Sequence, residues 1–185
     1  MLLRKIIRNV ETKPMDEKIV RRLSQRPGLK YMEYKDVVGK TLQQLLPKEI
    51  SGVLILIMDN RKNSNVGHFV LLMRHPRSGI TFFDPYGFGV HQLCKMTKNS
   101  HHLEKLFGMA GHRHVHDNRV AYQKRANDIQ TCGRHVVTRW NCASLNAKEY
   151  KAFMHLPGFS TDELITLLTL ESDFAHIVDK SVSRG

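Results

Sequence analysis

A short apolar run near the middle of the chain limits the available folds more than any other feature. Residues Gly52–Met58 read Gly-Val-Leu-Ile-Leu-Ile-Met and contain no polar side chain. A run of this length that is rich in β-branched residues is typical of a strand buried on both faces of a sheet. It is also far shorter than the roughly 18 apolar residues that a membrane span requires. We therefore expect a core strand and no contact with a membrane.

Two further strands are predicted after this run. Residues Gly67–Arg74 and Ile80–Phe83 are rich in apolar side chains, and the connection His75–Gly79 has the composition of a hairpin turn. The segment Asp84–Gly87, which reads Asp-Pro-Tyr-Gly, ends the second strand sharply. The sequence therefore predicts a β-hairpin whose second strand stops at Asp84.

Helical periodicity lies on both sides of the predicted strands. The order of helices, a few strands and then more helices favours an α+β fold. The chain has 185 residues with no linker or repeat, so we expect a single domain over residues 1–185. Helices are predicted over Asp16–Ser24, Asp36–Leu46, residues 90–108, a segment that begins at Cys132, and a segment behind the capping-box pattern Ser160–Glu163.

The charge balance indicates a class of partner. Lys and Arg number 29 against 17 Asp and Glu, which gives a formal net charge of +12. Nucleic acid is the usual acidic partner of so basic a chain, and a basic surface kept for solubility is the alternative. Three cysteines at wide spacing argue against a disulfide framework. Arg4 and Lys5 stand where a signal peptide needs apolar residues, so we expect a protein that is not secreted.

Three residues have the chemistry of a cysteine nucleophile and its activating groups. His68 lies at the start of one predicted strand, Asp84 ends the neighbouring strand, and Cys132 begins a predicted helix. In a hairpin, His68 and Asp84 would share one open end, where a carboxylate can orient an imidazole ring. A helix start favours the thiolate form of a cysteine, and a neighbouring imidazolium completes its activation. The plain alternative is a strand histidine, a turn-forming aspartate and a buried apolar cysteine.

The same helix start offers hydrogen-bond donors for an oxyanion. The backbone N–H of Cys132 is one donor, and Gly133 leaves the adjacent backbone uncrowded. A side-chain amide from the preceding loop is the expected second donor. Gln123, Asn127 and Gln130 are the candidates.

Four segments of the chain are similar to a known family. They are Gly67–Phe69, His75–Gly79, Phe82–Phe88 and Thr131–Val137, in the chain order His, Asp, Cys. These segments resemble the adenain-like cysteine proteases, which include maturation proteases of adenoviruses, virophages, Polinton-type elements and large DNA viruses. The wider group contains the SUMO-deconjugating proteases. The resemblance is strongest over residues 52–140, and it implies a small central mixed β-sheet packed between helices, with the nucleophile at the N-terminus of a core helix.

The resemblance implies a role for each matched residue. It makes His68 the general base, Asp84 its orienting carboxylate and Cys132 the nucleophile of a cysteine endopeptidase. In the family, a channel too narrow for side chains admits substrates that are cut after glycine, often in Gly-Gly or Gly-x motifs.

The positions implied for the substrate channel are Gly67, Phe69 and Gly133. Phe69 stands where the family commonly has Trp, which keeps an aromatic wall and removes an indole N–H.

The chain departs from the family pattern at the oxyanion glutamine. That glutamine usually lies six or seven positions before the nucleophile, where this chain has Ala126 and Arg125. Gln123 is the preferred candidate because Tyr122-Gln123 resembles the glutamine segment of the viral branch, and Asn127 is the alternative.

The resemblance also implies a biological setting. Viral members of the family process capsid and core precursor proteins during particle maturation. No cofactor is expected for the chemistry, while DNA, a viral peptide or both are expected as activators. We expect a monomer that binds DNA without sequence preference, in the virion and in the host cell, either in a cytoplasmic viral factory or in the nucleus.

Three other interpretations fit parts of the sequence. A protease of the same fold could remove a ubiquitin-like modifier, and a basic domain without enzymatic activity could bind DNA or the capsid. His112, His114 and His116 alternate along a predicted strand in the manner of a metal site. Zinc usually draws its ligands from more than one element, so we expect a polar strand face and no metal.

Overall fold

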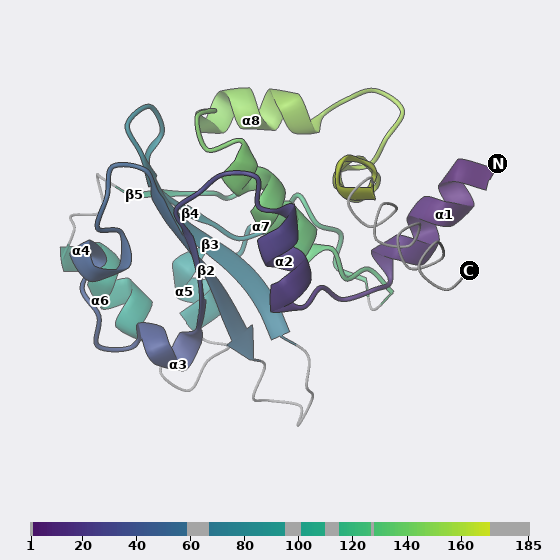
Figure 1. Cartoon of the computed structure of the whole chain (residues 1–185). Coiled ribbons are helices and arrows are strands. Elements are labelled where there is room, and N and C mark those ends of the chain that lie inside the picture. Colours follow the sequence, from purple (N-terminus) through teal and green to yellow (C-terminus); the bar gives the residue numbers. More distant parts are fainter. Residues whose placement is uncertain (1, 59–66, 95–100, 110–114, 127, 171–185) are drawn as a thin grey trace, which may run out of the picture.

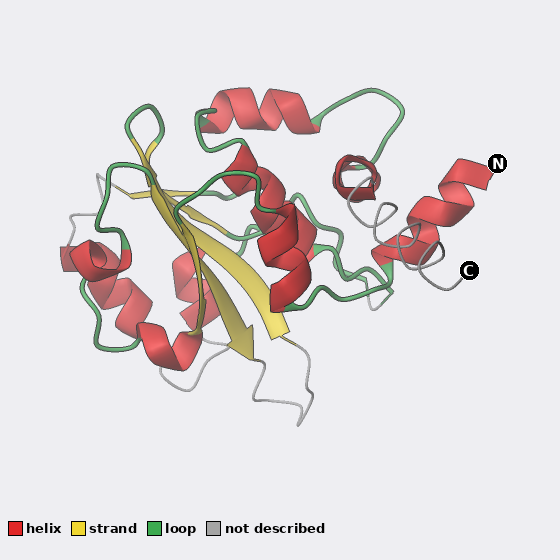
Figure 2. Ribbon diagram, viewed as in Figure 1, coloured by secondary structure: helices red, strands yellow, loops and turns green. Residues whose placement is uncertain are grey.

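A mixed β-sheet lies at the centre of the structure (Figure 1, Figure 2). The computed structural model describes residues 2–58, 67–94, 101–109, 115–126 and 128–170. Within these ranges the strands are β1 (Leu29–Glu33), β2 (Ser51–Met58), β3 (Gly67–His75), β4 (Gly79–Phe83) and β5 (Val115–Asp117), and they lie side by side in that order. β1 is parallel to β2, β5 is parallel to β4, and the pairs β2–β3 and β3–β4 are antiparallel.

Helices cover both faces of the sheet (Figure 1). One face carries α2 (Glu17–Leu23), α7 (Cys132–Asn141), α8 (Ala147–Met154) and the helical residues 161–170. The other face carries α3 (Tyr34–Val37), α4 (Leu42–Leu45), α5 (Gly89–Cys94) and α6 (His101–Met109). α1 (Leu2–Glu11) lines a common cleft with residues 121–125 and 160–163. The predicted α+β class is therefore confirmed.

No helix in the described part of the chain is both long enough and apolar enough to cross a membrane.

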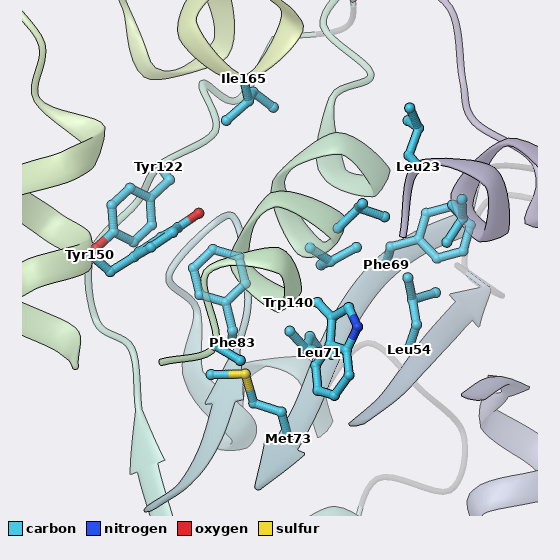
Figure 3. Packing of buried hydrophobic residues seen from close by; sticks show 14 of the residues in the cluster. Leu23, Leu54, Phe69, Leu71, Met73, Phe83, Tyr122, Trp140, Tyr150 and Ile165 are labelled. Atoms are coloured by element: carbon cyan, nitrogen blue, oxygen red, sulfur yellow. The ribbon is translucent and has the colours of Figure 1, made fainter. Parts of the chain in front are cut away.

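Side chains of the central strands point alternately to the two faces of the sheet, and each face has its own hydrophobic core. Val53 and Ile55 of β2 and Leu72 of β3 pack toward α3, α4, α5 and α6. Leu54 of β2 and Leu71 of β3 pack toward α7 (Figure 3). All five side chains are fully buried. Because successive side chains of a strand point to opposite faces, a strand covered on both sides needs an unbroken apolar run, and the prediction for Gly52–Met58 is confirmed.

The far end of α7 packs against β2 through a glycine. Trp140 is fully buried in this core (Figure 3), and its indole N–H donates to the Arg26 carbonyl at 3.0 Å. A Cβ on Gly52 would lie 2.7 and 2.8 Å from two ring carbons of Trp140. The absent side chain therefore lets α7 approach the sheet closely.

One predicted helix was wrong. Residues Asp36–Leu46 form two short helices, α3 and α4, with a turn between them. Gly39 has a positive φ of 84°, a conformation that a continuing helix does not contain. Thr41 then begins α4 with a capping box, in which its side chain and that of Gln44 each accept a backbone N–H from the other residue.

Most of the other predicted elements are confirmed. Asp16 caps α2 by accepting the Ile19 N–H at 2.8 Å, and β3 and β4 form the expected hairpin. The predicted helix over residues 90–108 corresponds to α5 and α6, with residues 95–100 outside the described part of the chain. The strand predicted over His112–His116 overlaps β5 at Val115 and His116, while residues 112–114 lie outside the described part of the chain. The sequence analysis missed α1, β1 and α8.

The close approach of Gly52 to Trp140 has a measurable consequence. Gly52→Ala is expected to lower the free energy of unfolding by about 1–3 kcal/mol, the usual effect of overpacking a filled core. Urea unfolding followed by circular dichroism measures it, since Trp140 is the single tryptophan and is itself to be changed. In a Trp140→Phe background the same glycine substitution is expected to cost clearly less. Equal losses in both backgrounds would contradict the explanation.

Candidate active site

The sheet places His68 and Asp84 at one end of the β3–β4 hairpin. His68 is the second residue of β3, and Asp84 directly follows β4. The His68 Nε2 atom and the Asp84 Oδ1 atom lie 2.7 Å apart in a hydrogen bond. Asp84 is fully buried and His68 is 9% exposed. The structure therefore brings these two predicted residues together.

The Asp84 carboxylate is held in place by backbone groups. Its Oδ1 atom also accepts the Tyr86 N–H at 2.9 Å, and its Oδ2 atom accepts the Phe88 N–H at 3.0 Å. The Asn118 side chain fixes the backbone of the same residue, accepting the Asp84 N–H at 2.7 Å and donating to the Asp84 carbonyl at 2.8 Å. These bonds leave Asp84 one orientation, in which Oδ1 faces the imidazole of His68.

Cys132 is the first residue of α7, and its thiol lies near enough to His68 to affect the ionisation of the imidazole. Since Asp84 occupies Nε2, the Nδ1 atom is the ring nitrogen left for the thiol. Burial lowers the pKa of His68, but the hydrogen bond with Asp84 and the interaction with Cys132 outweigh it and raise that pKa to about 9. At neutral pH the imidazole is therefore protonated, and a protonated imidazole beside a thiol stabilises the nucleophilic thiolate.

Tyr86 covers one face of the His68 ring, a position the sequence analysis missed. The two rings stack with centroids 4.7 Å apart and planes inclined by 23°. Burial first, and then the nearby Cys132 and Asp84, raise the pKa of Tyr86 to about 12. The phenol therefore stays neutral and keeps water from that face of the imidazole. Its place in Asp-Pro-Tyr-Gly, two residues after Asp84, was the available signal.

Gln123, the preferred oxyanion residue, is buried beside the Asp84 turn. Its backbone N–H donates to the Pro85 carbonyl at 2.9 Å, and its side-chain amide donates to the Ile129 carbonyl at 3.3 Å. Its Oε1 atom is buried and has no hydrogen-bond partner among the described residues. The alternative, Asn127, lies outside them. The role of Gln123 stays a prediction.

The residues predicted to line a substrate channel occupy a packed region. Phe69 is 6% exposed and meets the ring of Tyr31 edge-on, with centroids 6.2 Å apart. A Cβ on Gly133 would lie 3.0 Å from the Cβ of Met15 and 3.4 Å from the ring of Phe69. The missing side chain lets the start of α7 come close to β3 next to His68. Gly67 begins β3, and the channel role of all three residues stays a prediction.

Metal ligation has no candidate in the ranges that the structure describes. No group of three or more His, Cys, Asp or Glu side chains is placed there to hold a metal ion. Of the three alternating histidines, His116 is exposed on β5, and the other two fall in residues 112–114, outside these ranges.

The sequence is similar to a protein of a virophage. It is 28% identical over 155 residues to the uncharacterized protein V9 of the Sputnik virophage, and the match covers 77% of this chain and 81% of V9. No protein-family model and no solved structure matches the chain. The similarity is to a viral protein whose activity is not stated, so it does not assign an activity to this chain.

The raised pKa of His68 predicts how the free energy of unfolding depends on pH. Folding raises the His68 pKa from 6.5 to about 9, so between these values the folded state holds a proton that the unfolded chain releases. The stabilisation is complete below pH 6.5 and disappears as the pH rises through about 9. We expect the free energy of unfolding to fall across this window by up to about 1.4 kcal/mol per pH unit. Urea unfolding at several pH values measures the slope.

Asp84→Asn is the reference variant for this measurement. It removes the carboxylate that raises the His68 pKa, so its slope across the same window is expected to be flatter. A variant with the same slope as the wild type would contradict the assignment.

Proposed function

We propose that this protein is a cysteine endopeptidase in which Cys132 is the nucleophile, His68 the general base and Asp84 the group that orients His68. One observation carries the proposal: the buried His68 ring is hydrogen-bonded to Asp84, and the neighbouring Cys132 at the start of α7 also raises the pKa of His68. An imidazole between a carboxylate and a thiol at a helix start is the arrangement that makes a cysteine nucleophilic at neutral pH.

The chemistry follows from these positions. The Cys132 thiolate adds to the scissile carbonyl carbon, and the protonated His68 gives its proton to the leaving amine as the C–N bond breaks. The product is a thioester on Cys132. Water then attacks the thioester while His68 takes a proton, which releases the carboxylate product and restores the pair. The Cys132 N–H and the Gln123 amide are the proposed donors to the oxyanion in both steps.

The proposed substrates are viral precursor proteins. The resemblance to adenain-like proteases supports cleavage after glycine in capsid or core precursors, and the similarity to V9 of the Sputnik virophage supports a viral setting. The proposed places of action are the virion and the infected cell.

Thiol labelling tests the proposed nucleophile. Burial raises the pKa of Cys142, whereas Cys132 lies beside the protonated imidazole of His68. We expect iodoacetamide at neutral pH to label Cys132 much faster than Cys142, as measured by mass spectrometry of peptides. His68→Ala is expected to slow labelling at Cys132 and leave Cys142 unchanged. Equal rates at the two cysteines in the wild type would favour a binding protein without enzymatic activity.

Cleavage of co-encoded capsid proteins tests the proposed reaction. We expect defined fragments whose new C-termini are glycine, identified by mass spectrometry. Cys132→Ala should abolish cleavage, and His68→Ala should reduce kcat/KM by about a thousandfold or more, as loss of one member of such a triad usually does. Cys142→Ala is the matched control and is expected to remain active. Persistent cleavage by Cys132→Ala would refute the proposal.

We also propose that the protein binds DNA through its basic surface. The net charge of +12 supports this proposal, and the exposed Arg4, Arg8, Lys124 and Arg125 line one cleft of about 750 Å³ together with four carboxylates. Nonspecific affinity for double-stranded DNA is expected to fall with rising salt, with a slope of about −0.9 per neutralised phosphate in a plot of log K against log salt.

Substitution at the cleft is the control for this measurement. The double variant Arg4→Gln/Arg8→Gln should show a smaller slope, and fluorescence anisotropy measures both proteins. DNA is also expected to stimulate peptide cleavage at low salt. If DNA neither binds nor stimulates under those conditions, the DNA proposal fails while the protease proposal stands.

A further inference from the structure

A second buried carboxylate, Asp162, lies behind the start of α7. It belongs to the helical residues 161–170 and is 3% exposed. Its Oδ1 atom accepts the Thr131 hydroxyl and also accepts from His135 Nε2 at 3.0 Å, while its Oδ2 atom accepts the Lys124 backbone N–H at 2.8 Å. One side chain therefore joins the helical residues 161–170 to the start of α7 and to the Lys124 backbone, which lie 27 to 38 positions earlier in the chain.

The groups that Asp162 holds adjoin the proposed reaction centre. Thr131 immediately precedes Cys132, and Lys124 immediately follows Gln123. Cys132 and Gln123 are the residues proposed to donate to the oxyanion. Their relative position thus depends on a carboxylate that touches neither of them.

The Thr131 side chain does not cap α7, although Thr131 is at the N-cap position. A threonine at the N-cap normally accepts a backbone N–H from the first turn of its helix. Thr131 is the N-cap of α7, yet its side chain makes no such bond and gives its hydroxyl to Asp162 instead. The Thr131 hydroxyl therefore ties the residue before Cys132 to Asp162 and does not cap α7.

Neutral groups supply the hydrogen bonds to Asp162. Burial lowers the pKa of His135 more than the hydrogen bond to Asp162 raises it, so the ring is neutral at pH 7 and Nε2 carries the proton that Asp162 accepts. Glu11 also senses the charge of Asp162: burial first, and then the charges of Asp162 and Glu163, raise the pKa of Glu11. With donors of this kind the carboxylate fixes geometry and does not form an ion pair with His135.

We propose that Asp162 is a positioning residue for the proposed reaction, holding Thr131 and the Gln123–Lys124 backbone so that the oxyanion donors are in place before substrate binds. The inference rests on the proposed protease function. It assigns to Asp162 a part in stabilising the oxyanion and no part in activating the thiol, which depends on His68.

Two variants break opposite ends of this connection. Thr131→Val removes the hydroxyl donor, and Asp162→Asn keeps an oxygen for Thr131 while it sets an amide NH₂ against the Lys124 N–H. Each is expected to lower kcat for peptide cleavage about tenfold or more, with KM little changed, since an oxyanion donor matters most in the transition state. The rate of iodoacetamide labelling at Cys132 should stay at the wild-type value, because alkylation displaces iodide and forms no oxyanion.

Control variants separate positioning from general damage. Thr138→Val changes another buried threonine of α7 and is expected to leave both rates unchanged. Thr131→Ser keeps the hydroxyl and should retain the wild-type kcat, and near-ultraviolet circular dichroism verifies that every variant is folded. An unchanged kcat, or labelling and cleavage that fall together, would overturn the inference while wild-type activity upholds the protease. A wild-type protein that neither cleaves nor labels selectively at Cys132 would instead refute the proposed function, and the inference with it.

Discussion

The hydrogen bond between His68 and Asp84 is the interaction on which the site depends. Burial alone would lower the pKa of this imidazole and leave a neutral ring beside Cys132. Asp84 and Cys132 together reverse that effect, and the Asp84 carboxylate is held in place by the N–H groups of Tyr86 and Phe88 and by the side chain of Asn118. The positive charge of the His68 imidazole next to Cys132 therefore depends on the turn that begins at Asp84, directly after β4.

The second requirement is that α7 lies close to the sheet at both of its ends. Gly133 meets Phe69 and Met15 at the start of the helix, and Trp140 meets Gly52 near its end. A Cβ at Gly52 would overlap the Trp140 ring, and one at Gly133 would crowd Met15. Because His68 stands next to Phe69 on β3, this packing also decides whether the thiol reaches the imidazole. Core packing and site geometry are thus determined by the same contacts.

Local patterns were enough to predict the elements that carry the site. The apolar run in β2, the hairpin signals around residues 75–79 and the helix start at Cys132 are all short-range features, and the structure has them where the sequence placed them. β1 was missed because it reads Leu-Lys-Tyr-Met-Glu, a mixed pattern that becomes a strand only beside β2. The helix expected over Asp36–Leu46 from its apolar spacing is interrupted, because Gly39 has a positive φ and Thr41 caps a new helix.

Within the site, the residues that could not be predicted act through long-range contacts. Asn118 lies 34 positions from Asp84, and Asp162 lies 31 positions from Thr131. Asn118 belongs to no motif, and the capping-box pattern that contains Asp162 does not indicate its contact with Thr131, so both partners are visible only once the chain is folded. His68 and Asp84 could be paired in advance because the hairpin turn between them is short and carries its own signal.

The order of these residues along the chain has a consequence during synthesis. A ribosome releases His68 and Asp84 first, then Cys132 with its helix, and Asp162 last. The imidazole–carboxylate pair can form on a nascent hairpin, but the sulfur joins it only after β1 to β5 have been translated and α7 can fold onto them. A nascent polypeptide that stops before α7 therefore carries His68 and Asp84 without Cys132, and the three groups come together only after α7 has been translated.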